Sequence, residues 1–145
     1  MPTDLGRPFS PIITRVPPHM SPEDTPIYRR WAVTGLKNAL RQYFDVGLGY
    51  VEVPDRSLSP EIIKSWIRIN QKRADAVVEY EDHVKIVEFR HEVTPNAIGR
   101  ILTYGMLWKD DAVIEKPYKL LIVSNRYDKD VDHLASSIGI LYEVV

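Results

Sequence analysis

The sequence predicts a single-domain α/β protein with a mixed sheet flanked by helices, and three observations predict it. Two apolar, β-branched runs between Asp75 and Arg90 flank a short polar turn, which is typical of a β-hairpin. Helical periodicity of apolar residues lies both before and after this hairpin. The apolar run 118–123 is typical of a buried parallel strand, so helices and strands alternate in the second half of the 145-residue chain.

The N-terminal segment differs in composition from the rest. Prolines concentrate here and block a regular helix or central strand: seven of the 11 lie within the first 26 residues, at Pro2, Pro8, Pro11, Pro17, Pro18, Pro22 and Pro26. We therefore expect residues 1–24 to form an extended Pro-rich arm before an α/β domain at 25–145. Its apolar residues are potential anchors: Phe9, Ile12, Ile13 and Val16. They favour contact with another protein subunit, in an oligomer or assembly, and packing on the arm's own domain is the alternative.

Cap signals and apolar spacing place the elements before the hairpin. Thr25-Pro26 gives an N-cap and N1 signal, and apolar residues recur at helical spacing up to about Phe44. Two glycines then interrupt the chain before a short predicted strand at 50–53, which Pro54 stops. Ser59-Pro60 begins a further short helix, although residues 66–69 fit a strand equally well.

The elements after the hairpin follow the same logic. Thr94-Pro95 predicts a helix to about Lys109, with four residues toward the sheet: Ile98, Ile101, Leu102 and Gly105. After the strand at 118–123, residues 128–137 are typical of a short helix and residues 140–145 of a closing strand. Right-handed crossovers would join these strands into one sheet.

Glu88 interrupts an otherwise apolar strand. If Glu81-Asp82 is a two-residue loop, Asp75 lies opposite Glu88. A four-residue loop would set Asp75 opposite Arg90 instead, and Glu88 would stay on the same face because side-chain direction repeats every two residues. Two carboxylates this close repel each other unless a cation or a proton lies between them, so the pattern predicts a site for a hard divalent ion.

These residues resemble a motif of the PD-(D/E)XK nuclease superfamily: Asp75, then Glu88-Phe89-Arg90, then Arg100 and Tyr104 four apart on the next predicted helix. The resemblance covers about the last half of the chain. It implies a restriction-endonuclease-like core in which Asp75 and Glu88 bind Mg²⁺ or Mn²⁺. Arg90 stands where the family has a catalytic Lys, and Arg100 with Tyr104 where many members have Gln and Tyr.

The departures from this motif change the expected chemistry. A guanidinium stays protonated, with a pKa above about 12, so Arg90 cannot serve as a general base. It can still orient a phosphate or stabilise charge in the transition state. Many family members also have a Glu on the first helix, and residues 27–44 contain none. Arg90 and Arg100 beside Asp75 and Glu88 would also form a structural ion-pair cluster without metal, which is the alternative to a working metal site.

Composition limits the partners and the compartment. The net charge of −1 and the pI of about 6.4 argue against strong sequence-independent binding of nucleic acid, so any DNA contact must be local. Cations that precede the hairpin are the first candidates for it: Lys64, Arg68, Lys72 and Arg73. Others lie in the predicted first helix: Arg29, Arg30, Lys37 and Arg41. We expect Arg73 and Lys72, with Arg100 and Tyr104, to bind phosphate.

Other functional classes find no support in the sequence. It contains no cysteine, no glycine-rich nucleotide-binding loop and no apolar run of the roughly 20 residues that cross a bilayer. The Pro-rich N-terminus lacks the apolar core of a signal peptide. We therefore expect a protein of the cytoplasm or of a virion, with no membrane partner.

Two functions fit these observations. In the first, a nuclease-like fold with a degenerate catalytic motif serves as an assembly or nucleic-acid-binding module, for example as a structural component of a phage particle. In the second, the protein is an active Mg²⁺- or Mn²⁺-dependent DNA nuclease with catalytic residues Asp75, Glu88 and Arg90. The missing Lys, Gln and helix Glu favour the first.

Overall fold

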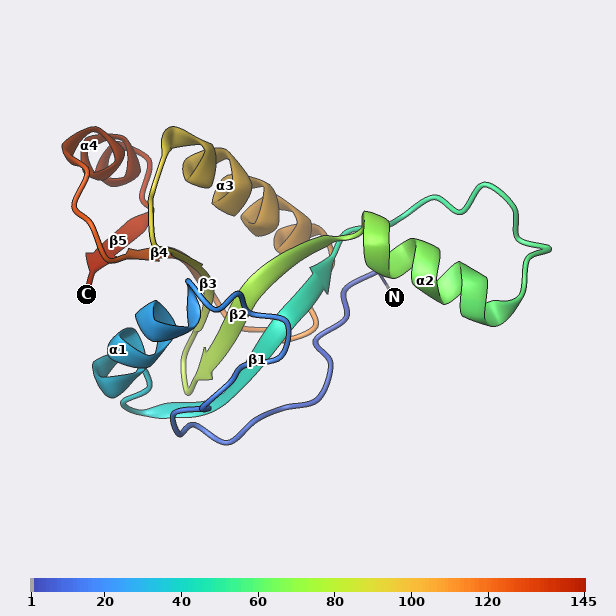
Figure 1. Ribbon diagram of the computed structural model, residues 1–145, viewed down its shortest axis with the longest axis horizontal. Coiled ribbons are helices and arrows are strands. Elements are labelled where there is room, and N and C mark those ends of the chain that lie inside the picture. Colours follow the sequence, from blue (N-terminus) through green and yellow to red (C-terminus); the bar gives the residue numbers. More distant parts are fainter. Residues whose placement is uncertain (1) are drawn as a thin grey trace.

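A computed structural model describes residues 2–145, so Met1, with which the predicted arm begins, lies outside the described residues. Its centre is a five-stranded sheet in chain order: β1 (Ala39–Leu48), β2 (Lys72–Tyr80), β3 (Val84–Arg90), β4 (Tyr118–Ser124) and β5 (Leu141–Val144). The first three strands are antiparallel and the last three are parallel. The predicted α/β class with a mixed sheet is confirmed (Figure 1).

Helices cover both faces of the sheet. On one face, α1 (Thr25–Gly35) packs its aromatic residues against β3 and β4. On the other face lie α3 (Pro95–Asp110) and α4 (Lys129–Ser137). The fourth helix, α2 (Pro60–Asn70), projects beyond the end of the sheet (Figure 1). None of the helices in residues 2–145 is long and apolar enough to cross a membrane.

Most of the predicted elements are confirmed, with their local causes. The Ser59 hydroxyl accepts a hydrogen bond from the Ile62 N–H at 3.3 Å, and α2 continues to Asn70, so residues 66–69 are helix rather than strand. The Asp128 carboxylate caps α4 in the same way. In α3, Leu102 is exposed, so the prediction that it faces the sheet was wrong.

The predicted first helix was too long, and the predicted strand at 50–53 was wrong. Helix α1 ends at Gly35, and Asn38 turns the chain with a positive φ of 66° into β1. The apolar residues of 39–44 fit both the helical and the strand period. Tyr43 and Phe44 are each apolar, and in a strand they face opposite sides of the sheet. Pairing along the whole of β2 decides in favour of the strand, which ends at Leu48, directly before Gly49 with its φ of 82°.

The N-terminal segment lies on its own domain, along the outer edge of β1. Asp4 pairs with Gly47 and Phe9 with Gln42 in isolated antiparallel bridges. The buried Gln42 amide donates hydrogen bonds to the backbone carbonyls of Ser10 and Ile12. Of the predicted apolar anchors, only Phe9 packs on the domain, and the other three are exposed: Ile12, Ile13 and Val16. Contact of this segment with another subunit therefore stays a prediction.

Candidate functional site

The hairpin brings the two predicted carboxylates together. The Tyr80 N–H donates to the His83 carbonyl at 2.8 Å, which closes a two-residue loop, and the register pairs Ala76 with Val87. Continued by one residue on each strand, this register sets Asp75 opposite Glu88. An oxygen of Asp75 accepts the backbone N–H of Phe89 at 2.9 Å. Of the two predicted registers, the one with the shorter loop is confirmed.

Glu88 is almost completely buried, with 1% of its surface exposed. Burial raises the pKa of Glu88 to about 9, with further contributions from the charge of Asp75 and from a hydrogen bond to it. Burial also raises the pKa of Asp75. One proton shared between these carboxyls therefore satisfies both near neutral pH.

Glu79 is the other buried glutamate of the sheet, and it has a different environment. Its carboxylate lies 2.7 Å from the Lys116 ammonium and 3.4 Å from the Arg41 guanidinium. A buried acid with a direct cation is a structural ion pair. Glu88 also has a direct cation, Arg90, but it faces a second acid, Asp75, as well, an arrangement that is common at functional sites.

Two guanidinium groups approach the carboxylates from different elements. Arg90 Nη2 lies 3.0 Å from Glu88 Oε2. Burial lowers the pKa of Arg90, but the charges of Glu88 and Asp75 outweigh this effect and raise it overall. From α3, Arg100 Nη1 lies 4.0 Å from the same Glu88 oxygen, and its side chain is 57% exposed. The cluster thus has one partly buried cation and one at the surface.

Asp24 is a third acid of the site, which the sequence analysis missed. It precedes α1 as the N-cap residue, yet its side chain does not cap the helix. One oxygen accepts the His91 N–H at 3.2 Å, and the other lies 3.9 Å from Arg90 Nη1. Thr25, the predicted N-cap, is already inside the helix. An Asp directly before Thr25-Pro26 was the signal in the sequence.

A groove of about 350 Å³ lies beside the carboxylates and contains all four predicted phosphate-binding residues. Its lining consists of Gln71, Lys72, Arg73, Gly99, Arg100, Thr103 and Tyr104. Tyr104 stays neutral, because burial and then the charge of Glu88 raise its pKa to about 12. Asp45 holds the Arg73 guanidinium, with Nε 2.9 Å from its carboxylate and Nη2 2.8 Å from its carbonyl oxygen. Lys72 is exposed.

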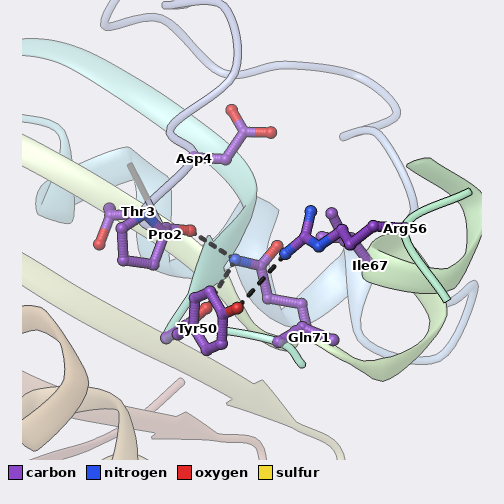
Figure 2. A pocket seen from close by; sticks show the side chains of 9 residues that line it. Pro2, Thr3, Asp4, Tyr50, Arg56, Ile67 and Gln71 are labelled. Atoms are coloured by element: carbon purple, nitrogen blue, oxygen red, sulfur yellow. Dashed lines mark hydrogen bonds between the residues drawn. The ribbon is translucent and has the colours of Figure 1, made fainter. Parts of the chain in front are cut away.

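A second pocket, of about 500 Å³, lies where α2 joins β2. The Gln71 amide donates to the carbonyls of Pro2 and Gly49, and an Arg56 nitrogen donates to the Tyr50 hydroxyl at 3.3 Å (Figure 2). These bonds attach the N-terminal segment to the base of α2. Asp4 is the one acid of the lining and points away from Gln71, so this pocket has the character of a structural junction.

Protein-family models, curated proteins and solved structures yield no match to this chain. Its chemistry must therefore be inferred from the geometry of the site.

The carboxylate oxygens of the site are of the type that a divalent ion such as Mg²⁺ prefers. Mg²⁺ often binds through one or two carboxylates and keeps several waters, and Asp75 with Glu88 would supply such a pair. Within residues 2–145, no group of three or more Asp, Glu or His side chains is arranged to hold a metal ion. Arg90, at 3.0 Å from Glu88, would compete with any such ion.

Proposed function

We propose that the protein is a nucleic-acid-binding domain with a restriction-endonuclease-like core, in which an ion-pair cluster has replaced phosphodiester hydrolysis. The observation that carries the proposal is the position of Arg90. Its guanidinium lies 3.0 Å from the buried Glu88, where a cleavage site would need a metal ion and a group able to lose a proton. A permanent cation at this place stabilises the acids without activating water.

The arrangement of elements supports the core assignment. A helix precedes three antiparallel strands, and a second helix crosses to a parallel strand, the order expected from the PD-(D/E)XK resemblance. Asp75 and Glu88 come from the two strands that the motif requires, and Asp24 adds an acid at the start of the first helix.

The charges explain why binding would be local. Asp24, Asp75 and Glu88 provide three carboxyl groups, and Arg90 with Arg100 provides two cations. A single proton between Asp75 and Glu88 makes the cluster neutral. The adjoining groove adds the exposed cation Lys72, so a phosphate backbone would lie along this groove rather than in the carboxylate pair.

Nucleic-acid binding is tested with fluorescent duplex and single-stranded oligonucleotides at several salt concentrations. We expect affinity to fall with salt and to drop at least about tenfold when Lys72→Glu and Arg100→Glu are combined, because two phosphate contacts become repulsive. Lys129→Glu is the matched control for Lys72→Glu alone, since it makes the same single charge change on α4, away from the groove. Equal losses in both proteins would place binding elsewhere, and no binding in the wild type would reject the proposal.

A metal-dependent DNA nuclease is the second candidate, and Asp24 favours it, because the acid missing from the predicted first helix is present after all. Asp75 and Glu88 would hold Mg²⁺ or Mn²⁺ once Arg90 left Glu88. The ion would lower the pKa of a bound water. Supercoiled plasmid with Mn²⁺ distinguishes the two functions.

For the plasmid assay we expect an inert wild type and nicking by Arg90→Lys, whose amine is smaller and able to lose its proton. Glu88→Ala in the Arg90→Lys background should abolish that nicking. If instead the wild type nicks the plasmid and Glu88→Ala abolishes this activity, the second candidate is established. The role in assembly, including a place in a phage particle, stays a prediction.

A further inference from the structure

Helix α2 makes few contacts with the rest of the described chain. None of its residues is buried, whereas α1, α3 and α4 each bury apolar residues against the sheet. Figure 1 shows it beyond the end of the sheet, reached by the long loop that follows β1. An amphipathic helix of this kind depends on tertiary contacts for stability, because isolated helices of about a dozen residues are marginal in water.

The outward face of α2 is an apolar stripe, which we define as Ile62, Trp66 and Ile69. These positions are i, i+4 and i+7, so they lie along one side of the helix. Their exposed fractions are 53%, 41% and 80%. Contiguous exposed apolar residues of this size are typical of interaction surfaces.

Two contacts hold α2 in place and keep the stripe exposed. The Trp66 indole N–H donates to the Glu52 carbonyl at 3.0 Å, and an Arg68 nitrogen lies 2.8 Å from an Asp45 oxygen. The first fixes the helix to its own loop and the second to β1. The stripe is therefore presented in a defined orientation, which lowers the entropic cost of binding.

We propose that the apolar stripe is a two-fold interface with a second copy of this chain, in which the two α2 helices pack antiparallel. Glu61 and Arg68 are seven residues apart and flank the stripe on one side. An antiparallel two-fold pairing brings Ile62 against Ile69 of the partner subunit and Glu61 beside Arg68 of the partner subunit. The Glu61–Arg68 pair therefore forms twice in the dimer, and the stripe covers itself.

The composition of the stripe favours a protein partner. A nucleic acid would require cations directed at its phosphates, whereas the exposed centre of this face is Ile, Trp and Ile. Arg68 retains 46% exposure of its side chain despite its bond to Asp45, so its remaining N–H groups are accessible to a second carboxylate. An interface built on one 11-residue helix is small, so we expect a reversible dimer at micromolar concentrations.

Sedimentation velocity across a concentration series tests the dimer directly. We expect concentration-dependent dimerisation in the wild type, and Ile69→Asp should weaken it at least about tenfold, since it places a charge in the apolar centre. Val33→Asp is the matched control: it makes the same kind of change at a 70% exposed position on α1. Trp31 and Trp108 are buried, so a blue shift of tryptophan emission on dimerisation reports Trp66.

A charge exchange tests the antiparallel geometry. Glu61→Lys and Arg68→Glu should each weaken self-association about fivefold, because both pairs become repulsive. An equimolar mixture should recover wild-type affinity, since a mixed dimer has both pairs attractive. Circular dichroism confirms that each variant is folded. A monomer at every concentration would overturn the proposal, as would a dimer insensitive to Ile69→Asp, which would place the contact on another surface such as the N-terminal segment.

Discussion

Arg90→Ala should lower the free energy of unfolding by about 3 kcal/mol at pH 7. Arg90 lies 3.0 Å from a Glu88 oxygen that is almost completely buried, and 3.9 Å from Asp24. Removing a partly buried cation leaves the remaining negative charge of the carboxyl pair without compensation in a medium of low dielectric. Urea denaturation of wild type and variant measures the difference.

Arg100→Ala is the matched control for this prediction. Its guanidinium approaches the same Glu88 oxygen, but at 4.0 Å and with 57% of the side chain exposed. Solvent screens such a pair, so we expect a loss of no more than about 0.5 kcal/mol. Equal effects of the two variants would mean that Arg90 does not compensate the buried charge, and the proposed ion-pair cluster would lose its basis.

The centre of the site could be predicted because its information is local. Two β-branched runs and a polar dipeptide between them fix the hairpin, and side-chain alternation then places Asp75 opposite Glu88. Similarly, the Ser59-Pro60 signal and the capping Asp128 fix the beginnings of α2 and α4. In each of these cases, neighbours in the sequence determine the geometry.

The remaining features depend on contacts between distant residues. Residues 39–44 have apolar spacing suited to a helix, and only pairing with β2 makes them a strand. Asp24 accepts the backbone N–H of His91, 67 positions away, so its place before Thr25-Pro26 indicates an acid at the start of the helix but not its contact with the site. The loop before α2 also depends on distant contacts, since no strand within residues 2–145 pairs with residues 50–53.

The exposed stripe of α2 illustrates a different limit. The short helix predicted from Ser59-Pro60 is confirmed, and its apolar residues include Ile62, Ile63, Trp66 and Ile67. Periodicity identifies an apolar face but not the surface that covers it. A helix that packs on its own sheet and one that packs on a second molecule have the same pattern, so the exposure of this face became evident only from the fold.

The stability of the wild type should fall as pH rises from about 5 to about 9, and Glu88→Gln should remove this dependence. The pKa of Glu88 is raised to about 9 in the folded protein, from an ordinary value near 4.5 in the unfolded chain. Between these values the folded state holds a proton that the unfolded state has lost, so stability declines with pH by up to about 1.4 kcal/mol per pH unit. Gln is neutral throughout and retains a donor for Asp75.

We therefore expect Glu88→Gln to match the wild type at pH 5 and to exceed it by about 3 kcal/mol at pH 8, as measured by urea denaturation across pH. Glu79→Gln is the control, because Glu79 has a cation at 2.7 Å and its replacement should destabilise the protein instead. A wild-type stability independent of pH would refute the shared proton.

Excess Mg²⁺ then separates the two proposed functions. An ion bound by Asp75 and Glu88 displaces the proton, so Mg²⁺ would stabilise the wild type, and more strongly at high pH. It would stabilise Glu88→Gln much less. An ion-pair cluster closed by Arg90 predicts no such difference.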